Sequence, residues 1–490
     1  MPGQVREPPP GGGGVARIPR SREGAVTLEA TMRLQLPLPA LSAATRAAGA
    51  LSRLAGTGGG TTLPGKLLWK LDPSAVSRLA ARLPRGSAAL SATNGKTTTA
   101  AMTAEILGGR VRLAHNRSGA NLVSGVASTL LAADGAELGL FEVDEAALPQ
   151  VASLVRPRVL CLGNLFRDQL DRYGELELVA ARWRTLVREL PAEATLVVNG
   201  DDPQLGNLVA ERPDAVVFGI DDPRHARRGG PQHAADSTHC VRCGAPYVFH
   251  AAYVGHLGDY ECTGCGHRRP ALTLSAEAIA LDGLNGASFD LRTPGETRRV
   301  TLRLPGLYNV YNALAAAALS RALGALLDEI VSGLERFDAA FGRFERIEMD
   351  GRRLLMLLIK NPAGANEAVR TLVTGASPTL AVVALNDAIA DGKDVSWIWD
   401  VDFEPLLDGL ERVIVTGDRA AELALRFKYA GFDPEAIEVV PSLERGLDRG
   451  LELTPADGEL VVLPTYTAML ALRRIVSKRG HVPQYWERAA

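Results

Sequence analysis

The feature that most constrains the fold is an alternation of short apolar runs with longer, Ala- and Leu-rich stretches of helical length. In the first half of the chain, the apolar runs occupy residues 87–92, 138–143, 159–163 and 194–200. Short apolar strands separated by helices are typical of a parallel sheet that is covered on both faces. A second series occupies residues 354–359, 379–387, 412–418, 437–440 and 459–465. Because 490 residues are too many for one core, we predict an α/β protein with two domains.

The alternation is interrupted once. It stops at about Asp221, and the chain up to Pro270 is rich in Arg, Gly, His and Cys. We therefore expect an insert in the first domain, and a boundary between the two domains between about Gly306 and Gly342. The predicted divisions are a first domain over 36–312, its insert over about 236–270, and a C-terminal domain over 313–490.

The first 35 residues differ from the rest. They are rich in Pro, Gly and Arg and include GGGG at 11–14, so they cannot pack a core. We expect a disordered extension, with Met32 as an alternative start. The segment lacks the apolar region of a secretory signal, and no apolar run reaches the ~18 residues of a membrane helix. We expect a cytoplasmic protein, and the net charge of −2 gives no reason to expect nucleic acid as a partner.

Four of the five cysteines form two C-x2-C pairs, CVRCG from residue 240 and CTGCG from residue 262. This spacing is typical of a zinc ribbon, and four thiolates leave no open position on the metal. We predict a structural zinc site; disulfides are the alternative, which a reducing compartment disfavours. The predicted zinc ligands are Cys240, Cys243, Cys262 and Cys265.

The remaining cysteine and the histidines near the pairs have other expected roles. Cys161 lies in an apolar run and is expected in the core. No cysteine is then left as a nucleophile, so the chain by itself cannot release ammonia from glutamine through a thioester. Solvent-facing positions are expected for His239, His250, His256 and His267.

The stretch SATNGKTTTA at 91–100 follows an expected strand and opens an expected helix. That context suits a phosphate-binding loop, in which backbone N–H groups face an anion, Lys96 reaches the β- and γ-phosphates and the Thr97 hydroxyl ligates Mg²⁺. The match to the general motif is imperfect, because Leu90 occupies the first glycine position. Further along, FEVDE at 141–145 ends a strand, so Glu142 or Asp144 can reach the same metal.

These motifs, in this order, resemble those of the Mur ligases, which form amides at the expense of ATP in cell-wall synthesis. The other matching stretches are NLFRDQLDRYGE (164–175), VVNGDDP (197–203), LPGLYNVYNALAA (304–316) and FGRFE (341–345). The resemblance spans roughly residue 87 to the C-terminus. It implies a Mur-ligase-like ATP-binding central domain with a parallel sheet, interrupted by the zinc ribbon, and a second α/β domain.

The resemblance also implies individual roles. Thr97 and Glu142 correspond to Mg²⁺ ligands. The positions that correspond to nucleotide contacts are Thr93, Asn94, Gly95, Lys96, Thr97, Thr98, Asn309, Asn312 and Arg343. Three residues depart from the usual pattern, namely Ala92, Gln169 and Tyr308, and Gln169 leaves a second metal position open.

Within the Mur ligases, the chain is similar to the MurT family, the synthase subunits of lipid II isoglutaminyl synthase. Only about 55 residues separate Met32 from the phosphate loop, too few for a domain that binds a UDP-linked precursor. The four-cysteine insert, KNPAGANE (360–367), DGKDVSWIWDVDFE (391–404) and PTYTAML (464–470) complete the likeness. The resemblance implies ATP-dependent amidation of the α-carboxyl of D-glutamate in lipid II to D-isoglutamine, through an acyl phosphate. Ammonia would come from a separate glutaminase subunit, GatD, and the lipid-borne substrate would place the chain at the inner face of the membrane.

In that family, the ligase subunit supplies an acid that orients a histidine of the glutaminase. Our first choice for this acid is Asp394, followed by Asp391 and Asp387. We predict that Trp397 and Trp399 anchor the stretch from the same face of one strand. Acids that merely solvate a loop are the alternative.

Two other functions remain open. One is a partner-independent Mur or folylpolyglutamate-synthase-like ligase that adds an amino acid. The other is a non-catalytic nucleotide-binding scaffold, suggested by Leu90, Ala92 and Gln169.

Overall fold

The computed structural model describes residues 37, 45, 62–116, 120–168, 176–232, 235–338, 344–375 and 377–482. Our predictions for residues 1–35, including the start at Met32, and for Gln169 and Arg343 lie outside these residues.

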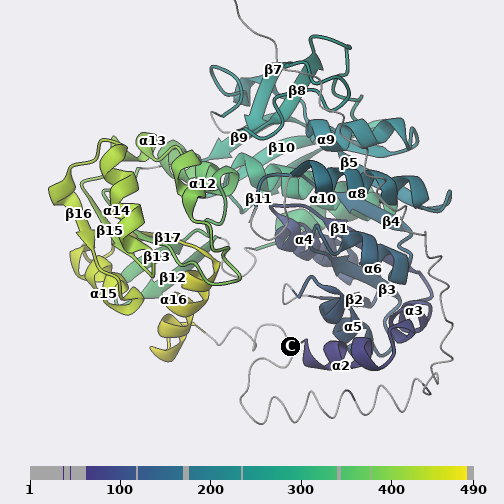
Figure 1. The fold of residues 1–490 in the computed structure, drawn as a ribbon, viewed down its shortest axis with the longest axis horizontal. Coiled ribbons are helices and arrows are strands. Elements are labelled where there is room, and N and C mark those ends of the chain that lie inside the picture. The colour runs from purple at the N-terminus through teal and green to yellow at the C-terminus, as the bar shows by residue number, and fades with distance from the viewer. Residues whose placement is uncertain are drawn as a thin grey trace, which may run out of the picture.

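The first half of the described chain forms a nine-stranded sheet with the order β11-β10-β9-β6-β5-β4-β1-β3-β2 (Figure 1). Neighbouring strands run parallel from β2 to β9, and β9, β10 and β11 are antiparallel. The strands are β1 (Ser87–Ser91), β2 (Leu113–His115), β3 (Leu138–Glu142), β4 (Val159–Leu162), β5 (Thr195–Asn199), β6 (Val216–Ile220), β9 (Leu274–Asp282), β10 (Gly286–Thr293) and β11 (Glu296–Leu302).

Helices cover both faces of this sheet, as the apolar strands predict. One face carries α4 (Lys96–Gly108), α10 (Leu307–Ala322) and α11 (Leu327–Arg336). The opposite face carries α2 (Leu63–Leu71), α3 (Ser74–Ala80), α5 (Val123–Ala132), α6 (Leu148–Val155) and α8 (Leu176–Glu189). Helix α10 is Ala-rich, and nearly all of its residues are buried. Its small side chains let it pack closely on helix α4 and on the strands of the first sheet.

The second sheet has six strands in the order β12-β13-β17-β14-β15-β16, antiparallel only between β12 and β13. Its strands are β12 (Glu345–Met349), β13 (Arg352–Met356), β14 (Leu380–Ala384), β15 (Arg412–Thr416), β16 (Ile437–Val439) and β17 (Glu459–Pro464). Its covering helices are α12 (Pro362–Gly375) and α14 (Ala420–Tyr429) on one face, and α15 (Leu443–Leu453) and α16 (Tyr466–Lys478) on the other.

The division between the two packing units differs from our expected boundary at 312/313. Most of α10 and all of α11 lie beyond residue 312, yet both helices belong to the core of the first sheet. The second sheet begins only with β12. By packing, the division therefore falls between α11 and β12, at the late end of the interval that we predicted.

The insert is a two-stranded hairpin, β7 (Tyr247–Val254) and β8 (Leu257–Cys262), that stands beside the β9 side of the first sheet (Figure 1). It is anchored through Asp201, whose carboxylate accepts hydrogen bonds from Tyr311 of α10 and from Arg269. Within the described residues, none of the helices is long and apolar enough to cross a membrane.

Candidate active site

The loop between β1 and α4 has the shape of a phosphate-binding turn. Gly95, its N-terminal cap, has φ of +85°, and a Cβ built there would lie 1.9 Å from Oδ1 of Asn312. Only glycine satisfies both restrictions. The backbone N–H groups of Thr93 and Asn94 each donate to Asn164, to its carbonyl and its side-chain oxygen respectively, both at 2.9 Å. These bonds hold the loop in one conformation, and they fix the direction in which the N-terminus of α4 faces.

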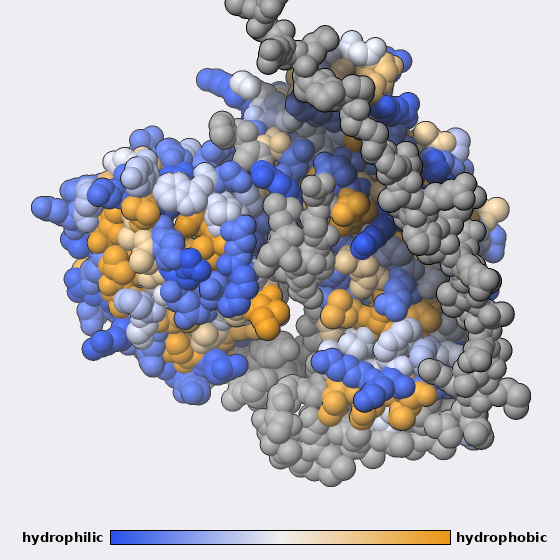
Figure 2. Space-filling view, viewed as in Figure 1, coloured by the Kyte–Doolittle hydropathy of each residue, from blue (hydrophilic) through white to orange (hydrophobic). Residues whose placement is uncertain are grey.

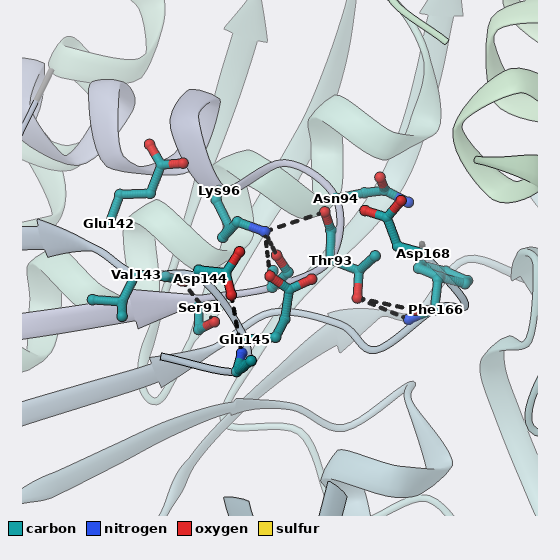
Figure 3. Close-up of polar contacts among 12 residues, drawn as sticks. Ser91, Thr93, Asn94, Lys96, Glu142, Val143, Asp144, Glu145, Phe166 and Asp168 are labelled. Atoms are coloured by element: carbon teal, nitrogen blue, oxygen red, sulfur yellow. Dashed lines mark hydrogen bonds and ion pairs between the residues drawn. The ribbon is translucent and has the colours of Figure 1, made fainter. Parts of the chain in front are cut away.

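Lys96 is buried beneath this loop (Figure 3). Its Nζ donates to Glu145 Oε2 at 2.7 Å and to the carbonyl of Ala92. Burial alone would lower the pKa of Lys96, but Glu145 and the nearby Glu142 and Asp144 outweigh it and raise the pKa. Burial likewise works against the ionised form of Glu145, yet Lys96 keeps the pKa of that carboxyl below its ordinary value. Each partner therefore favours the ionised form of the other.

A candidate Mg²⁺ site lies at the end of β3. Thr97 Oγ1 donates to Glu142 Oε1 at 3.0 Å, and Asn116 bonds both backbone groups of Glu142. A hydroxyl and a carboxylate oxygen in contact at the end of a parallel strand suit a hard divalent cation. Asp144, the alternative ligand, is buried and accepts from the backbone of Ala146.

An open cavity lies between the two domains next to the loop. Asn309 and Asn312 line it and bond each other at 3.0 Å. Tyr308, Phe344 and Leu357 contribute aromatic and aliphatic walls. An apolar lining with a few fixed amides is usual for a site that holds a small organic ligand.

Two polar contacts join the domains at this cavity. The side-chain amides of Asn94 and Asn361 bond each other reciprocally, at 3.2 and 3.1 Å. Lys360 forms a salt bridge with Asp168, a carboxyl whose pKa is raised by burial. The phosphate loop is therefore in direct contact with the start of α12.

Sequence analysis did not single out Glu145, Asp168, Lys360 or Glu367. The available signal for Glu145 was its place among the acids at the end of a strand. The available signal for the other three was their place in NLFRDQLDRYGE (164–175) and KNPAGANE (360–367), but those stretches do not show how the two domains meet.

The four cysteines of the insert converge as predicted. Their sulfur atoms lie within 4.8 Å of one another, with Sγ–Sγ distances of 3.6 Å for Cys240–Cys265 and 3.4 Å for Cys243–Cys262. In each knuckle, the N–H of the glycine bonds the carbonyl of the first cysteine, from Gly244 to Cys240 and from Gly266 to Cys262. Four thiols at these distances fit a tetrahedral Zn²⁺ with no open position. Cys161 is fully buried in β4, and burial raises the pKa of its thiol.

Our expectation that the four histidines face solvent was wrong for two of them. His239 and His250 are exposed. His267 is buried under the knuckles and its Nδ1 lies 2.8 Å from the hydroxyl of Tyr247. His256 is fully buried at the β7–β8 turn, 3.5 Å from Asp202 and against the ring of Phe166. His267 thus packs inside the insert, whereas His256 packs where the insert meets the first domain.

The three acids proposed for the partner lie in different surroundings. Asp394 is exposed, and hydrogen bonds from Ser396 hold its pKa below the ordinary value. Asp391 is buried, accepting from the backbone N–H of Thr467 at 2.8 Å and from its hydroxyl. Asp387 pairs with Arg419 at 3.2 Å and with Lys393 at 3.6 Å. Only Asp394 combines an exposed position with an ionised form and no salt bridge among the described residues.

The predicted strand with Trp397 and Trp399 on one face was wrong. Residues Ser396–Asp400 form a turn of 3₁₀-helix, which the bond from Ser396 N to Asp394 begins. Trp397 packs on the domain core, whereas Trp399 is 47% exposed and meets Tyr429 edge to face. On the face shown in Figure 2, hydrophobic residues are interspersed with hydrophilic ones over the C-terminal domain.

Comparison with known proteins places the chain in a family. A model of the Mur ligase middle domain matches residues 91–320, and a model of the MurT ligase C-terminal domain matches residues 358–469. The chain is 34% identical to the lipid II isoglutaminyl synthase (glutamine-hydrolyzing) subunit MurT of Streptococcus pneumoniae, over 88% of this chain and 94% of that protein. It is 30% identical to the MurT subunit of Staphylococcus aureus, over 84% and 91% of the two chains.

A solved structure supports the fold independently. The pseudomurein peptide ligase type C of Methanothermus fervidus superposes with a TM-score of 0.65 at 21% identity, covering 82% of this chain and 80% of that one. The chain therefore belongs to the MurT family of Mur ligases.

Proposed function

We propose that the chain is the ligase subunit that amidates the α-carboxyl of D-glutamate in lipid II to D-isoglutamine, in peptidoglycan synthesis. It would use ATP, and ammonia from a glutaminase subunit, GatD. The observation that carries the proposal is the 34% identity over 88% of the chain to a protein named as a subunit of lipid II isoglutaminyl synthase. The phosphate loop, the interdomain cavity and the exposed Asp394 supply parts that this reaction needs.

The phosphate loop supports the nucleotide half of the proposal. Thr93, Asn94, Gly95 and Thr98 form the turn in which the phosphates would lie, and Asn309 and Asn312 border the cavity beside it. Lys96 would exchange its contact with Glu145 for the β- and γ-phosphates. The ligands for Mg²⁺ would be Thr97 and Glu142. When bound, Mg²⁺ offsets the negative charge of the phosphates.

The reaction then needs two displacements. An oxygen of the substrate carboxylate attacks the γ-phosphorus, the bond to the β-phosphate oxygen breaks, and ADP leaves. Ammonia attacks the carbonyl carbon of the acyl phosphate, the carbon–oxygen bond to phosphate breaks, and phosphate leaves with the proton that nitrogen loses. Positioning and fixed charge carry such a phosphoryl transfer, and the buried Lys96 and the N-terminus of α4 provide both.

The cysteines support a role for a partner. The four cysteines of the insert suit a closed zinc site, which stabilises the knuckles and leaves no position for substrate. Cys161 is inaccessible in β4. Every cysteine in the chain is therefore accounted for, and a thioester with glutamine must form on another chain.

Asp394 is the acid that we assign to the glutaminase site. A carboxylate that stays ionised can fix the tautomer of a histidine and stabilise its imidazolium form. Asp391, our second choice, instead holds the start of α16 through Thr467.

The test combines purified chain, ATP, Mg²⁺ and a lipid II analogue with glutamate in its stem. The chain alone should convert the carboxyl to a carboxamide with ammonium chloride, but not with glutamine. Added glutaminase subunit should restore the reaction with glutamine. Mass spectrometry separates this outcome from addition of an amino acid, which would contradict the proposal, as would ATP turnover with no change in the lipid.

A further inference from the structure

One carboxylate in the interdomain cavity has no role in the chemistry described above. Glu367 lies on α12, lines the cavity and is only 2% exposed. Neither of its oxygens accepts a hydrogen bond from a residue that the structure describes. Arg370, one turn away, comes within 3.6 Å of it but donates instead to the carbonyl of Tyr253 at 2.6 Å. Keeping a buried carboxylate without a hydrogen bond is costly, so its retention calls for a ligand that donates one.

The phosphate loop and helix α12 both border the cavity. The loop contributes Asn94, Gly95 and Thr98, and α12 contributes Ala363, Gly364, Glu367 and Ala368, positions that share one helix face. The start of α12 contacts the loop through Asn361 and Asn94, and Glu367 lies between one and two turns further along the helix. Tyr308, Phe344 and Leu357 add aromatic and aliphatic walls, and Lys360 adds a cation. A flat apolar group fits the aromatic and aliphatic walls.

The predicted phosphate and Mg²⁺ contacts do not line the cavity. Glu142, Lys96 and Asn94 follow one another across Figure 3, and of these three only Asn94 borders the cavity. With phosphates at Gly95 and Lys96, a nucleoside that continues into the cavity would extend past Asn309 and Asn312 and along α12. Its base would then reach Glu367, which lies further along that helix.

We propose that Glu367 selects the nucleotide by accepting a hydrogen bond from the exocyclic 6-amino group of adenine. This inference rests on the proposed function, because it takes the nucleotide to be ATP. Burial raises the pKa of Glu367, which favours its protonated form. A protonated Glu367 can also donate to N1 of adenine while its other oxygen accepts from the amine.

The experiment compares ATP with purine riboside 5′-triphosphate, which lacks only the 6-amino group. Equilibrium dissociation constants are measured by calorimetry with Mg²⁺ and no lipid substrate. The wild-type chain should bind the analogue about 10-fold or more weakly than ATP, because the analogue leaves Glu367 without its donor. In Glu367→Leu this ratio should fall to about 1. Glu367→Gln retains an acceptor oxygen and should keep the preference.

Arg370→Met is the matched control, since it removes the neighbour of Glu367 and leaves the carboxylate; it should keep the wild-type ratio. Glu367→Leu should also melt at a higher temperature than wild type, because it removes a buried carboxyl that has no hydrogen bond from the described residues. A wild-type ratio near 1 overturns the inference. So does a Glu367→Leu variant that melts lower and still prefers ATP, which would make Glu367 a structural group. A chain that binds neither nucleotide would contradict the proposed function itself.

Discussion

At the scale of single residues, the candidate active site is held by a buried ion pair. Lys96 and Glu145 contact each other at 2.7 Å with both side chains almost wholly buried. Removing one partner from such a pair leaves the other charge buried without a partner, at a cost of about 3–5 kcal/mol. The lysine that would clamp the phosphates is therefore also needed for the stability of the protein without nucleotide.

A pair of variants separates the two roles of Lys96. Lys96→Met should abolish ATP-dependent amidation and lower the free energy of unfolding by about 3–5 kcal/mol, because Glu145 remains buried and unpaired. The double variant Lys96→Met with Glu145→Gln removes both charges, and should regain most of the stability without regaining activity. Urea unfolding and amidation with ammonium chloride measure the two effects. A folded Lys96→Met protein with normal turnover would refute the role of Lys96 in phosphate binding.

The role that we propose for Asp394 is tested by the ratio of two rates of amidation, the glutamine-driven rate and the ammonia-driven rate. Asp394→Asn should leave the complex assembled and should lower glutamine-driven amidation by orders of magnitude, because the histidine of the glutaminase loses its orienting carboxylate. Amidation with free ammonia should persist, since it bypasses the glutaminase.

Asp391→Asn serves as the comparison. Its carboxylate fixes Thr467, so this variant should lose stability and lower both rates together. An Asp394→Asn variant with an unchanged ratio of the two rates would indicate that the acids of this stretch merely solvate a loop.

At the scale of elements, the sequence predicted the strands whose position depends on a local pattern of apolar residues. Apolar runs became β1, β3, β4 and β5 nearly residue for residue, because a strand buried on both faces is a short and nearly continuous apolar run. The same reasoning failed at residues 396–400, where Trp397 and Trp399 have the spacing of two residues on one face of a strand. There, the bond from Ser396 N to Asp394 starts a 3₁₀ turn instead. The burial of His256 and His267 depends on packing in a small insert, for which the sequence has no periodic signal.

The zinc ribbon is the element whose loss can be measured directly. We expect one Zn²⁺ per chain in protein purified without chelator, and none in Cys265→Ser. The variant should melt at a lower temperature, because metal binding supplies much of the folding free energy of such a small unit. ATP should bind several-fold more weakly, since Val254 and Leu257 of the hairpin line the interdomain cavity, in which we propose that the nucleotide binds.

Thr263→Ala is the control for this variant. Thr263 lies between two of the predicted zinc ligands, and its hydroxyl donates to the carbonyl of Pro246. It should keep its zinc and its affinity for ATP. Elemental analysis that finds no zinc in the wild-type protein would refute the site.

At the scale of the whole molecule, the acidic stretch 391–404 faces two ways. Asp394 points to solvent, whereas Asp400 and Asp402 face arginines of the other domain. Arg167 lies 3.5 Å from Asp400, and Arg227 lies 3.8 Å from Asp402. Residue pairs so distant in sequence have no motif, so the sequence could predict the two domains but not the surface on which they meet.

These two ion pairs should contribute to domain contact more than to stability. All four side chains are between 27% and 40% exposed, so each pair is worth about 0–1 kcal/mol and is screened by salt. The double variant Asp400→Asn with Asp402→Asn should therefore unfold at nearly the wild-type urea concentration. Its ammonia-driven amidation should be lower than that of the wild type at low ionic strength, because the interdomain cavity closes less often. At high ionic strength the two rates should converge, since salt already weakens the pairs in the wild type.

Asp408→Asn changes the charge of the same domain at an exposed position and should follow the wild type at both salt concentrations. A double variant that equals the wild type at low salt would show that Lys360–Asp168 and Asn94–Asn361 hold the domains together without these arginines.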